Sequence, residues 1–146
     1  MLRLAAVLLL VSSSLQGAEI TLNRAVQVLV QVESAGRKDA VGDAGAAYGI
    51  LQMHSIMIQD YNRIANADLQ HGDAFSPEVS NFGFRTGLMH YLQDIENPTL
   101  KHIAFIWNGG GGARHRVEHP IDDAKQRNLE IYYAKVLSAY KTQSNK

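Results

Sequence analysis

Several features are scarce or missing in this chain, and each absence excludes a class of protein. The 146 residues contain no cysteine, so disulfide bonds, thiolate zinc sites and cysteine nucleophiles are excluded. The formal net charge is zero, so the composition gives no indication of nucleic acid as a partner. No apolar run reaches the roughly 20 residues that a bilayer-spanning helix needs. With no internal repeat and no linker visible, we expect one domain.

The first eighteen residues have the features of a secretory signal peptide. Arg3 precedes an apolar run over residues 4–11, and small residues suited to cleavage follow near Gly17 and Ala18. We therefore expect a secreted or periplasmic protein whose mature domain covers residues 19–146. A signal segment that is kept as a membrane anchor is the alternative, but the run is short and no stop-transfer pattern follows it.

Helical periodicity dominates the mature chain and predicts helices over residues 21–35, 55–65, 76–95, 99–107 and 122–140. Thr21 and Ser76 are expected as N-caps, and Gly36 is expected to end the first helix in the left-handed conformation. Residues 36–53 contain four glycines and no helical period, so a loop with a short strand pair is expected there. The predicted fold class is mainly α, with a small irregular or β segment near residues 40–53.

The helix predicted over residues 76–95 carries an apolar set that we expect to be buried: Val79, Phe82, Leu88, Met89, Leu92 and Ile95. Gly83 and Gly87 are one turn apart on this helix and are expected to let another helix approach closely.

Glu33 is the first candidate for chemistry. It follows Val26, Leu29 and Val30 at helical spacing, so it lies on the stripe predicted to face the core. Loss of water disfavours a charged carboxylate, so the pKa of Glu33 is expected to rise. A carboxylic acid that stays protonated near neutral pH is what cleavage of a glycosidic bond requires, because the leaving oxygen must receive a proton.

Three short segments resemble the lysozyme-like superfamily, in particular goose-type lysozymes and lytic transglycosylases with an SLT domain. They are Glu33-Ser34-Ala35-Gly36, Tyr48-Gly49-Ile50-Leu51-Gln52 and Phe105-Ile106-Trp107-Asn108-Gly109-Gly110. They occur in the order found in that superfamily and span most of the mature chain. The resemblance implies a lysozyme-like α+β fold and cleavage of the β-1,4 bond between N-acetylmuramic acid and N-acetylglucosamine in peptidoglycan glycan strands. It implies no cofactor and no metal, and we expect a monomer.

The resemblance also implies roles for single residues. Glu33 would be the general acid, with Ser34 beside it, and Asp43 would hold the attacking water. Gln52 would bind a substrate N-acetyl group or brace the site. Tyr48 and Trp107 would offer aromatic faces to sugar rings. Asn108 and the backbone from Gly109 to Gly112 would line the cleft opposite Glu33, because glycines let a sugar approach the backbone closely.

Each of these residues also has a plainer interpretation. Asp43 stands between glycines and could form a turn through a bond to nearby backbone. Gln52 could serve only as a loop brace. Trp107 could be a core residue, and Asn108 could end its helix in the left-handed conformation.

Two departures from the superfamily leave the reaction outcome open. His54 stands where goose-type lysozymes have a second aspartate, and Trp107 stands where the family has a tyrosine. An inverting hydrolase needs a carboxylate to activate water, and Asp43 would have to do this alone. If it cannot, the sugar's own N-acetyl or 6-hydroxyl group attacks, as in a lytic transglycosylase that leaves a 1,6-anhydro end.

Two other functions stay open at this stage. One is a glycan-binding module of the same fold that does not cut. The other is a zinc hydrolase, because His115-Arg116-Val117-Glu118-His119 fits the H-x-x-E-H pattern. The preceding glycines and Pro120 make a long helix through that pattern unfavourable. Chitin is an alternative substrate.

Overall fold

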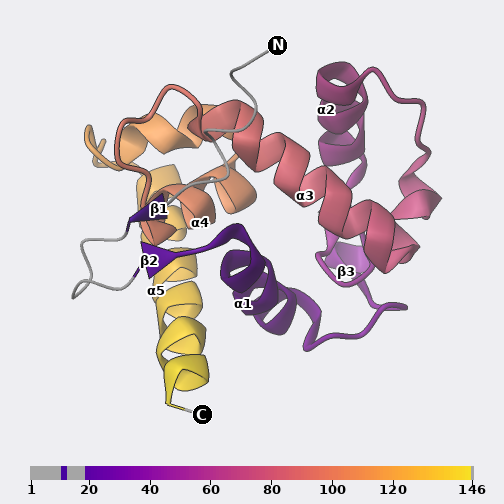
Figure 1. Cartoon of the computed structure of the whole chain (residues 1–146), viewed down its shortest axis with the longest axis horizontal. Helices are drawn as coiled ribbons and strands as arrows, with labels where there is room; N and C mark the ends of the chain where they lie inside the picture. The colour runs from indigo at the N-terminus through magenta and orange to yellow at the C-terminus, as the bar shows by residue number, and fades with distance from the viewer. Residues whose placement is uncertain (1–10, 13–18, 146) are drawn as a thin grey trace. The chain divides into compact units, whose positions relative to one another are not determined.

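The computed structural model describes residues 11–12 and 19–145, and this part is mainly helical with a two-stranded and a three-stranded antiparallel sheet (Figure 1). This confirms the predicted mainly α architecture and the β segment near residues 40–53. Apart from Val11 and Ser12, the predicted signal peptide lies outside the described residues. Among the helices of the described part, none has both the length and the apolar character to cross a membrane.

The helices are α1 (Leu22–Ser34), α2 (Ser55–Ala65), α3 (Pro77–Leu92), α4 (Leu100–Gly109) and α5 (Ala124–Ser144), with short 3₁₀ helices η1 (Asp43–Gly45), η2 (His71–Phe75) and η3 (Gly111–Arg116). The strands are β1 (Val11–Ser12), β2 (Glu19–Ile20), β3 (Val41–Gly42), β4 (Ala47–Tyr48) and β5 (Met53–His54). The contacts divide the chain into two compact units. Unit 1 is Met1–Val28 with Tyr91–Lys146, and unit 2 is Leu29–His90. The single-domain organisation stays a prediction.

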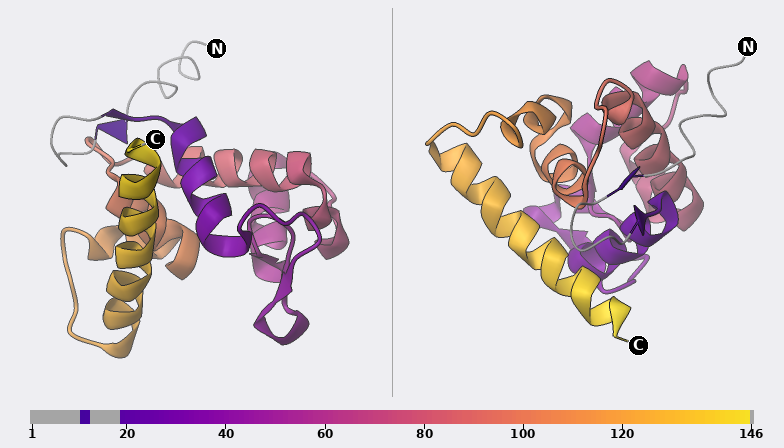
Figure 2. Two further views of the ribbon diagram at one scale, coloured as in Figure 1. Left: turned by 90° about the horizontal axis from the view of Figure 1, so that it is seen from below. Right: turned by 60° about the vertical axis from the view of Figure 1, so that its left-hand side comes forward.

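Unit 1 is built on the packing of α4 against α5 and η3, and Figure 2 shows α5 as one continuous helix. Phe105, Ala113 and Leu129 form a buried cluster, with Val117 and Tyr133 packed against it. Complete burial of a large apolar side chain contributes about 1.5–3 kcal/mol, so this cluster is a principal source of stability for the unit.

The start of α1 is tied to the end of α5 within the same unit. The Arg24 guanidinium lies 4.6 Å from the centre of the Tyr140 ring and donates to the Ser144 hydroxyl at 2.5 Å. The Thr21 hydroxyl accepts from the Arg24 N–H at 3.2 Å, which confirms Thr21 as the N-cap of α1. Gly36 is left-handed as predicted, with φ +81°, but α1 ends at Ser34 and the left-handed backbone begins one residue earlier, at Ala35, with φ +52°.

Unit 2 contains the sheet, α2, η2 and most of α3. Its strands pair in the order β3–β4–β5, so that Tyr48 lies between Val41 and Met53. The glycine-rich sequence predicted a strand pair here, and the structure has a third strand just before α2. The buried apolar side chains of this unit include Leu51, Met53, Ile58, Tyr61, Phe84 and Leu88.

All five predicted helices form, and the limits of α2 match the prediction of residues 55–65. The Ser76 hydroxyl accepts from the Val79 N–H at 3.3 Å, which confirms Ser76 as the cap of α3. This helix ends at Leu92, three residues before the predicted end. The last helix begins at Ala124 because the Asp123 carboxylate accepts from the Gln126 N–H at 2.7 Å and caps it.

The predicted burial of α3 is partly wrong. Phe82 is 60% exposed, whereas Phe84, absent from the predicted set, is 1% exposed. The inward face follows Ser80, Phe84 and Leu88 at steps of four, and this stripe turns Phe82 away from it. Leu88 and Leu92 are buried as predicted, while Val79, Met89 and Ile95 are half-buried.

Of the two glycines on this helix, only Gly83 allows a close approach. A Cβ added at Gly83 would lie 3.3 Å from Met53 Cε and 3.5 Å from the Tyr61 ring, so α2 does pack closely there. A Cβ at Gly87 would meet no atom within 4 Å, so the same prediction for Gly87 is wrong.

Candidate functional site

Glu33 lies in the last turn of α1, within unit 2. Its side chain is half-buried, while Leu29 of the predicted stripe is fully buried and Val26 and Val30 are half-buried. Glu33 takes part in an interaction within the protein. The carboxyl is therefore neither in the core nor in open solvent. Its raised pKa stays a prediction.

Ser34 fixes the end of α1 to the turn that carries the second sequence segment. It is 4% exposed, and its hydroxyl donates to the Ile50 carbonyl at 2.8 Å. The hydroxyl is used inside the protein, so Ser34 positions the helix end rather than contacting a substrate. Because Glu33 is the preceding residue, this bond also holds the backbone of Glu33 next to the Gly49–Gln52 turn.

Gln52 holds the Gly49–Gln52 turn together, as the plainer interpretation of this residue predicted. Its side-chain amide donates to the Gly49 carbonyl at 2.9 Å and to the Ala40 carbonyl at 3.1 Å. Its Oε1 would lie 2.1 Å from a Cβ built at Gly42, so only glycine leaves room for this side chain. Both hydrogens of the Gln52 amide are used in these two bonds. Donating one of them to a substrate N-acetyl group would require breaking a bond that holds the turn.

Asp43 makes a contact that neither sequence interpretation foresaw. Its Oδ2 lies 2.7 Å from His54 Nε2, with side-chain exposures of 68% for Asp43 and 40% for His54. A carboxylate only accepts hydrogen bonds, so the imidazole donates from Nε2. The aspartate is thus bound by a side chain rather than by nearby backbone. His54, noted in the sequence only as a departure, is a member of the site.

Tyr48 lies at the centre of a stack of three rings. Its ring centre is 4.0 Å from that of His71 at an interplanar angle of 8°, and 4.7 Å from that of Phe75 at 20°. Two rings this close and this parallel cannot fit side by side on one face, so they cover both faces of Tyr48. The expectation that Tyr48 offers a face to a sugar is therefore wrong for this arrangement. Phe75, at one end of the stack, is 37% exposed.

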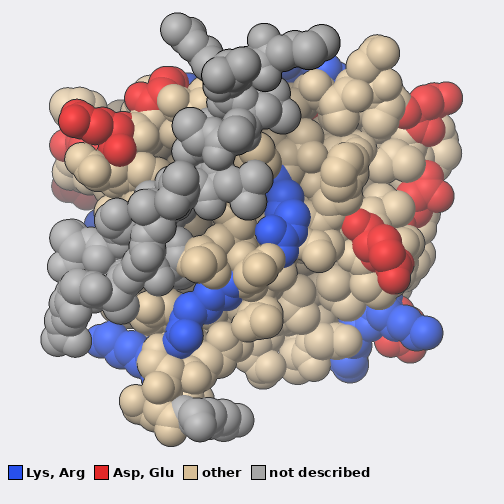
Figure 3. All heavy atoms as spheres, viewed as in Figure 1, with Lys and Arg blue, Asp and Glu red and all other residues tan. Residues whose placement is uncertain are grey.

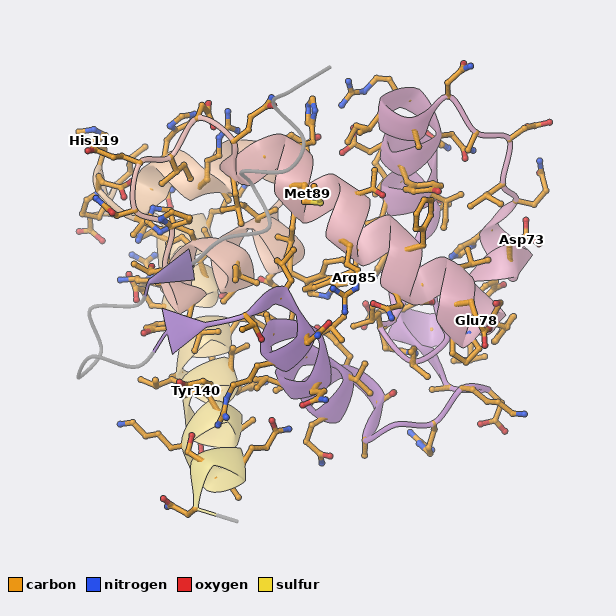
Figure 4. All side chains as sticks on the ribbon, viewed as in Figure 1. Asp73, Glu78, Arg85, Met89, His119 and Tyr140 are labelled. Carbon is orange, nitrogen blue, oxygen red and sulfur yellow. The ribbon has the colours of Figure 1, made fainter. Side chains whose placement is uncertain are left out.

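The polar groups beside Phe75 bind their own turn. Figure 4 shows Asp73 on the turn before α3 and Glu78 at the start of that helix. Asp73 accepts from the Gln70 N–H at 2.8 Å, and Glu78 accepts from the Ser76 hydroxyl at 2.9 Å. Hydrogen bonds from the backbone N–H of Glu78 and from the Ser76 hydroxyl hold the pKa of the Glu78 carboxyl below its usual range. Asp73 thus stabilises the start of η2, and Glu78 stabilises the start of α3.

Trp107 and Asn108 lie in unit 1, on the last turn of α4. Trp107 is half-buried and makes an interaction within the protein, and Asn108 is exposed. The residue with positive φ at the helix end is Gly110, at +82°, so Asn108 does not end the helix in the left-handed conformation. The roles of Trp107 as a sugar platform and of Asn108 as a cleft residue stay predictions.

Two of the four glycines after Asn108 serve internal packing. A Cβ at Gly109 would lie 2.7 Å from a Leu129 methyl, and one at Gly111 would lie 2.1 Å from the Tyr91 ring. Internal packing is thus sufficient to explain Gly109 and Gly111, and the prediction that this backbone lines a sugar cleft is not tested. Gly110 and Gly112 have open space around them.

The H-x-x-E-H pattern does not form one helical face. Glu118 accepts at 2.5 Å from Nε2 of His102, a histidine that is 2% exposed, and His102 Nδ1 accepts from the Thr99 N–H at 3.1 Å. The pattern runs from the end of η3 into a turn, with His115 and His119 exposed. Within the described part of the chain, no group of three histidine, aspartate or glutamate residues is arranged to hold a metal ion.

The charged side chains are distributed in small groups. The face shown in Figure 3 carries separate Lys and Arg side chains and separate Asp and Glu side chains among uncharged atoms. Several of the charges are used in ion pairs, including Arg116 with Asp123 and Arg114 with Asp94. The paired arginines hold the pKa of Asp94 and of Asp123 below the usual range.

Searches against protein-family models and against curated proteins found no match to this chain.

Proposed function

We propose that this chain is a peptidoglycan-cleaving glycosidase in which Glu33 is the general acid. The observation that carries the proposal is the bond from the Ser34 hydroxyl to the Ile50 carbonyl. It joins the helix end that bears Glu33 to the Gly49–Gln52 turn, and these are two of the three segments on which the resemblance to lysozyme-like enzymes rests.

The surroundings of Glu33 suit a proton donor. Glycosidic bond cleavage needs a carboxyl group that gives its proton to the leaving oxygen as the bond breaks. Glu33 is half-buried at the end of a helix, and Ala35 and Gly36 turn the chain away from it with φ of +52° and +81°. The exposed loop residues that follow leave solvent access on that side.

The proposed substrate bond is the β-1,4 link between N-acetylmuramic acid and N-acetylglucosamine, and the proposed location is secreted or periplasmic. Phe75, a partly exposed ring stacked on Tyr48, would offer an aromatic face to a sugar, which is the part first assigned to Tyr48. Aromatic side chains combine a large apolar face with defined geometry, which suits the flat apolar side of a pyranose ring.

The deciding experiment is digestion of purified peptidoglycan by the wild type and by Glu33→Gln. The wild type is expected to reduce turbidity and release soluble muropeptides. The Glu33→Gln variant is expected to lose activity by about 10²–10⁴-fold, because the proton donor is gone, and to keep its circular dichroism spectrum. Glu96→Gln, an exposed glutamate in unit 1, is the matched control and is expected to retain full activity.

Three outcomes would contradict the proposal. If Glu33→Gln kept more than about a tenth of the activity, the general acid would be another group. Binding of peptidoglycan without any released product would indicate a glycan-binding module. Inhibition by a chelator would indicate a metal-dependent hydrolase. Parallel digestion of chitin decides between the two glycans.

A further inference from the structure

One side of α5 is exposed to solvent. The buried residues of this helix are Gln126, Leu129 and Val136, and Leu129 packs against Phe105 of α4. The right-hand view of Figure 2 shows α4 on one side of α5 and the opposite side uncovered. Exposed residues recur there at steps of three or four, so they share one side of the helix. We call this set the outer face of α5: Arg127, Asn128, Ile131, Ala134, Lys135, Ser138 and Lys141.

The charges of the outer face of α5 are all positive. Residues 124–145 contain a single acidic residue, Glu130. It is half-buried, and its carboxylate lies 2.8 Å from the Lys101 ammonium of α4, so its charge is used inside unit 1. Arg127 pairs with Asp122 at 3.0 Å, but the two side chains are 64% and 97% exposed. Such an exposed ion pair is weak, so Arg127 can exchange Asp122 for another anion.

The two lysines of this face have no ion pair in the part of the chain that the structure describes. Neither Lys135 nor Lys141 lies within ion-pair distance of a carboxylate there. Arg127, Lys135 and Lys141 follow one another along the helix at steps of eight and six residues, which is about 12 and 9 Å at the α-helical rise. A row of cations of this length fits a surface that bears many negative groups better than it fits one small anion.

An exposed apolar side chain within this row of cations indicates which kind of anionic surface fits. Ile131 is 59% exposed, and it lies one helical turn from Arg127 and one turn from Lys135. Its neighbours on the same face, Ala134 and Ser138, have small side chains. A soluble polyanion offers no apolar layer to an isoleucine. The headgroup boundary of a phospholipid membrane accepts an apolar side chain together with the cations around it.

We propose that the outer face of α5 docks unit 1 onto a membrane that contains anionic phospholipids. In the docked state, Arg127, Lys135 and Lys141 lie among the lipid phosphates, and Ile131 enters the boundary of the acyl chains. The attachment is reversible, because a few cations and one apolar side chain bind far more weakly than a spanning helix. This docking does not depend on Glu33 or on the proposed glycan cleavage. It adds a place of action, which is wall material next to the membrane.

Co-sedimentation of the full chain with lipid vesicles tests this docking. Vesicles of phosphatidylglycerol and phosphatidylethanolamine are compared with neutral vesicles of phosphatidylcholine, and the ratio of the two partition constants is measured. Attachment through the apolar run over residues 4–11 adds to both constants, so the ratio reports the effect of charge. The wild type is expected to prefer the anionic vesicles. The Lys135→Gln/Lys141→Gln double variant is expected to lower the ratio about 25-fold, at about fivefold for each lysine. In about 1 M salt the preference is expected to disappear, because the charges are screened beyond about 3 Å.

Two further variants separate the outer face of α5 from net charge and from apolar contact. Arg37→Gln/Lys38→Gln removes the same charge from exposed positions of unit 2, and this matched control is expected to keep the wild-type ratio. Ile131→Ser keeps every charge and is expected to weaken binding to the anionic vesicles about fivefold, because the apolar contact is lost. All of these positions are exposed, so the circular dichroism spectra are expected to stay unchanged.

The possible failures are distinguishable. Equal binding of the wild type to anionic and neutral vesicles would overturn the docking. An equal loss in the α5 double variant and in the unit 2 double variant would assign the preference to net charge and would also overturn it. Unchanged binding by Ile131→Ser, together with capture of the wild type by an acidic wall polymer, would identify a polyanion and not a membrane as the partner. Failure of the wild type to digest peptidoglycan, with the vesicle preference intact, would overturn the proposed function alone.

Discussion

Two glycine-rich segments, residues 36–54 in unit 2 and residues 109–119 in unit 1, have similar composition and different uses. In the second segment the charged groups are engaged in structure: Arg114 with Asp94, Arg116 with Asp123, and Glu118 with the buried His102. The first segment is held by hydrogen bonds of Gln52 and of Ser34, which precedes the segment, while Asp43 and His54 are open to solvent.

This comparison shows that glycine content alone does not identify a ligand site. Gly42 and Gly49 make room for Gln52 and for the Ala74 carbonyl, and Gly109 and Gly111 make room for Leu129 and Tyr91. In both segments these glycines serve packing. The first segment differs because the hydrogen bonds of Ser34 and Gln52 hold its backbone without Asp43 and His54. The side chains of that pair are therefore available for chemistry.

The largest expected stability effect compares one glycine from each segment. Gly49→Ala should cost about 3–5 kcal/mol, because its Cβ would lie 1.9 Å from the Ala74 carbonyl oxygen and φ is +77°. Gly111→Ala should cost about 1–3 kcal/mol, because the atom it meets belongs to the Tyr91 side chain, which can shift. Urea denaturation measures both, and Gly72→Ala, with open space around it, is the control. Equal losses at the two positions would contradict this difference between the segments.

The second prediction concerns the bond that joins α1 to the Gly49–Gln52 turn. Ser34→Ala should lower the free energy of unfolding by about 1–2 kcal/mol, because the partly buried Ile50 carbonyl loses its donor. The exposed Ser138→Ala should have almost no effect. If Ser34→Ala left stability unchanged and raised KM for peptidoglycan, Ser34 would be a substrate contact instead.

A third, smaller effect is expected at the ring stack. Phe75→Ala should cost about 0.5–1.5 kcal/mol for the lost ring pair with Tyr48 and should weaken glycan binding, which co-sedimentation with peptidoglycan measures. Ile56→Ala, at a side chain that is 66% exposed, is the control and should keep full binding. Unchanged binding by Phe75→Ala would remove this stack from the proposed site.

The smallest effect belongs to the ion pair of Asp123 with Arg116 and depends on pH. The pKa of Asp123 is lowered in the folded protein, so the carboxylate contributes stability above the ordinary aspartate pKa of about 3.9. That contribution is lost as the pH falls from there through the lowered value. Asp123→Asn keeps a capping oxygen for Gln126 and should therefore be less stable than the wild type at neutral pH and equal to it in strong acid. A pH-independent difference in urea midpoints would mean that the cap, and not the charge, is responsible.

Much of the fold could be predicted from local signals. Thr21, Gly36, Ser76 and the apolar spacing predicted where helices begin and end, and these signals act within one or two turns of the chain. Where the prediction failed, contacts from elsewhere in the chain decided the outcome. Phe84 rather than Phe82 is buried because the inward stripe of α3 follows Ser80 and Leu88, and no local rule distinguishes the two rings.

For the candidate site, the sequence by itself determined the order and type of the elements, because capping and helical periodicity are local properties. It also indicated Glu33 and Asp43 as candidates. Only the tertiary structure decided that His54 holds Asp43, that His71 and Phe75 cover Tyr48, and that Glu118 pairs with His102. These partners lie 11 to 27 residues apart, and the register of a three-stranded sheet and the packing of short helices bring them together. That information is absent from any local stretch of the chain, because it depends on which side chains share a space after folding.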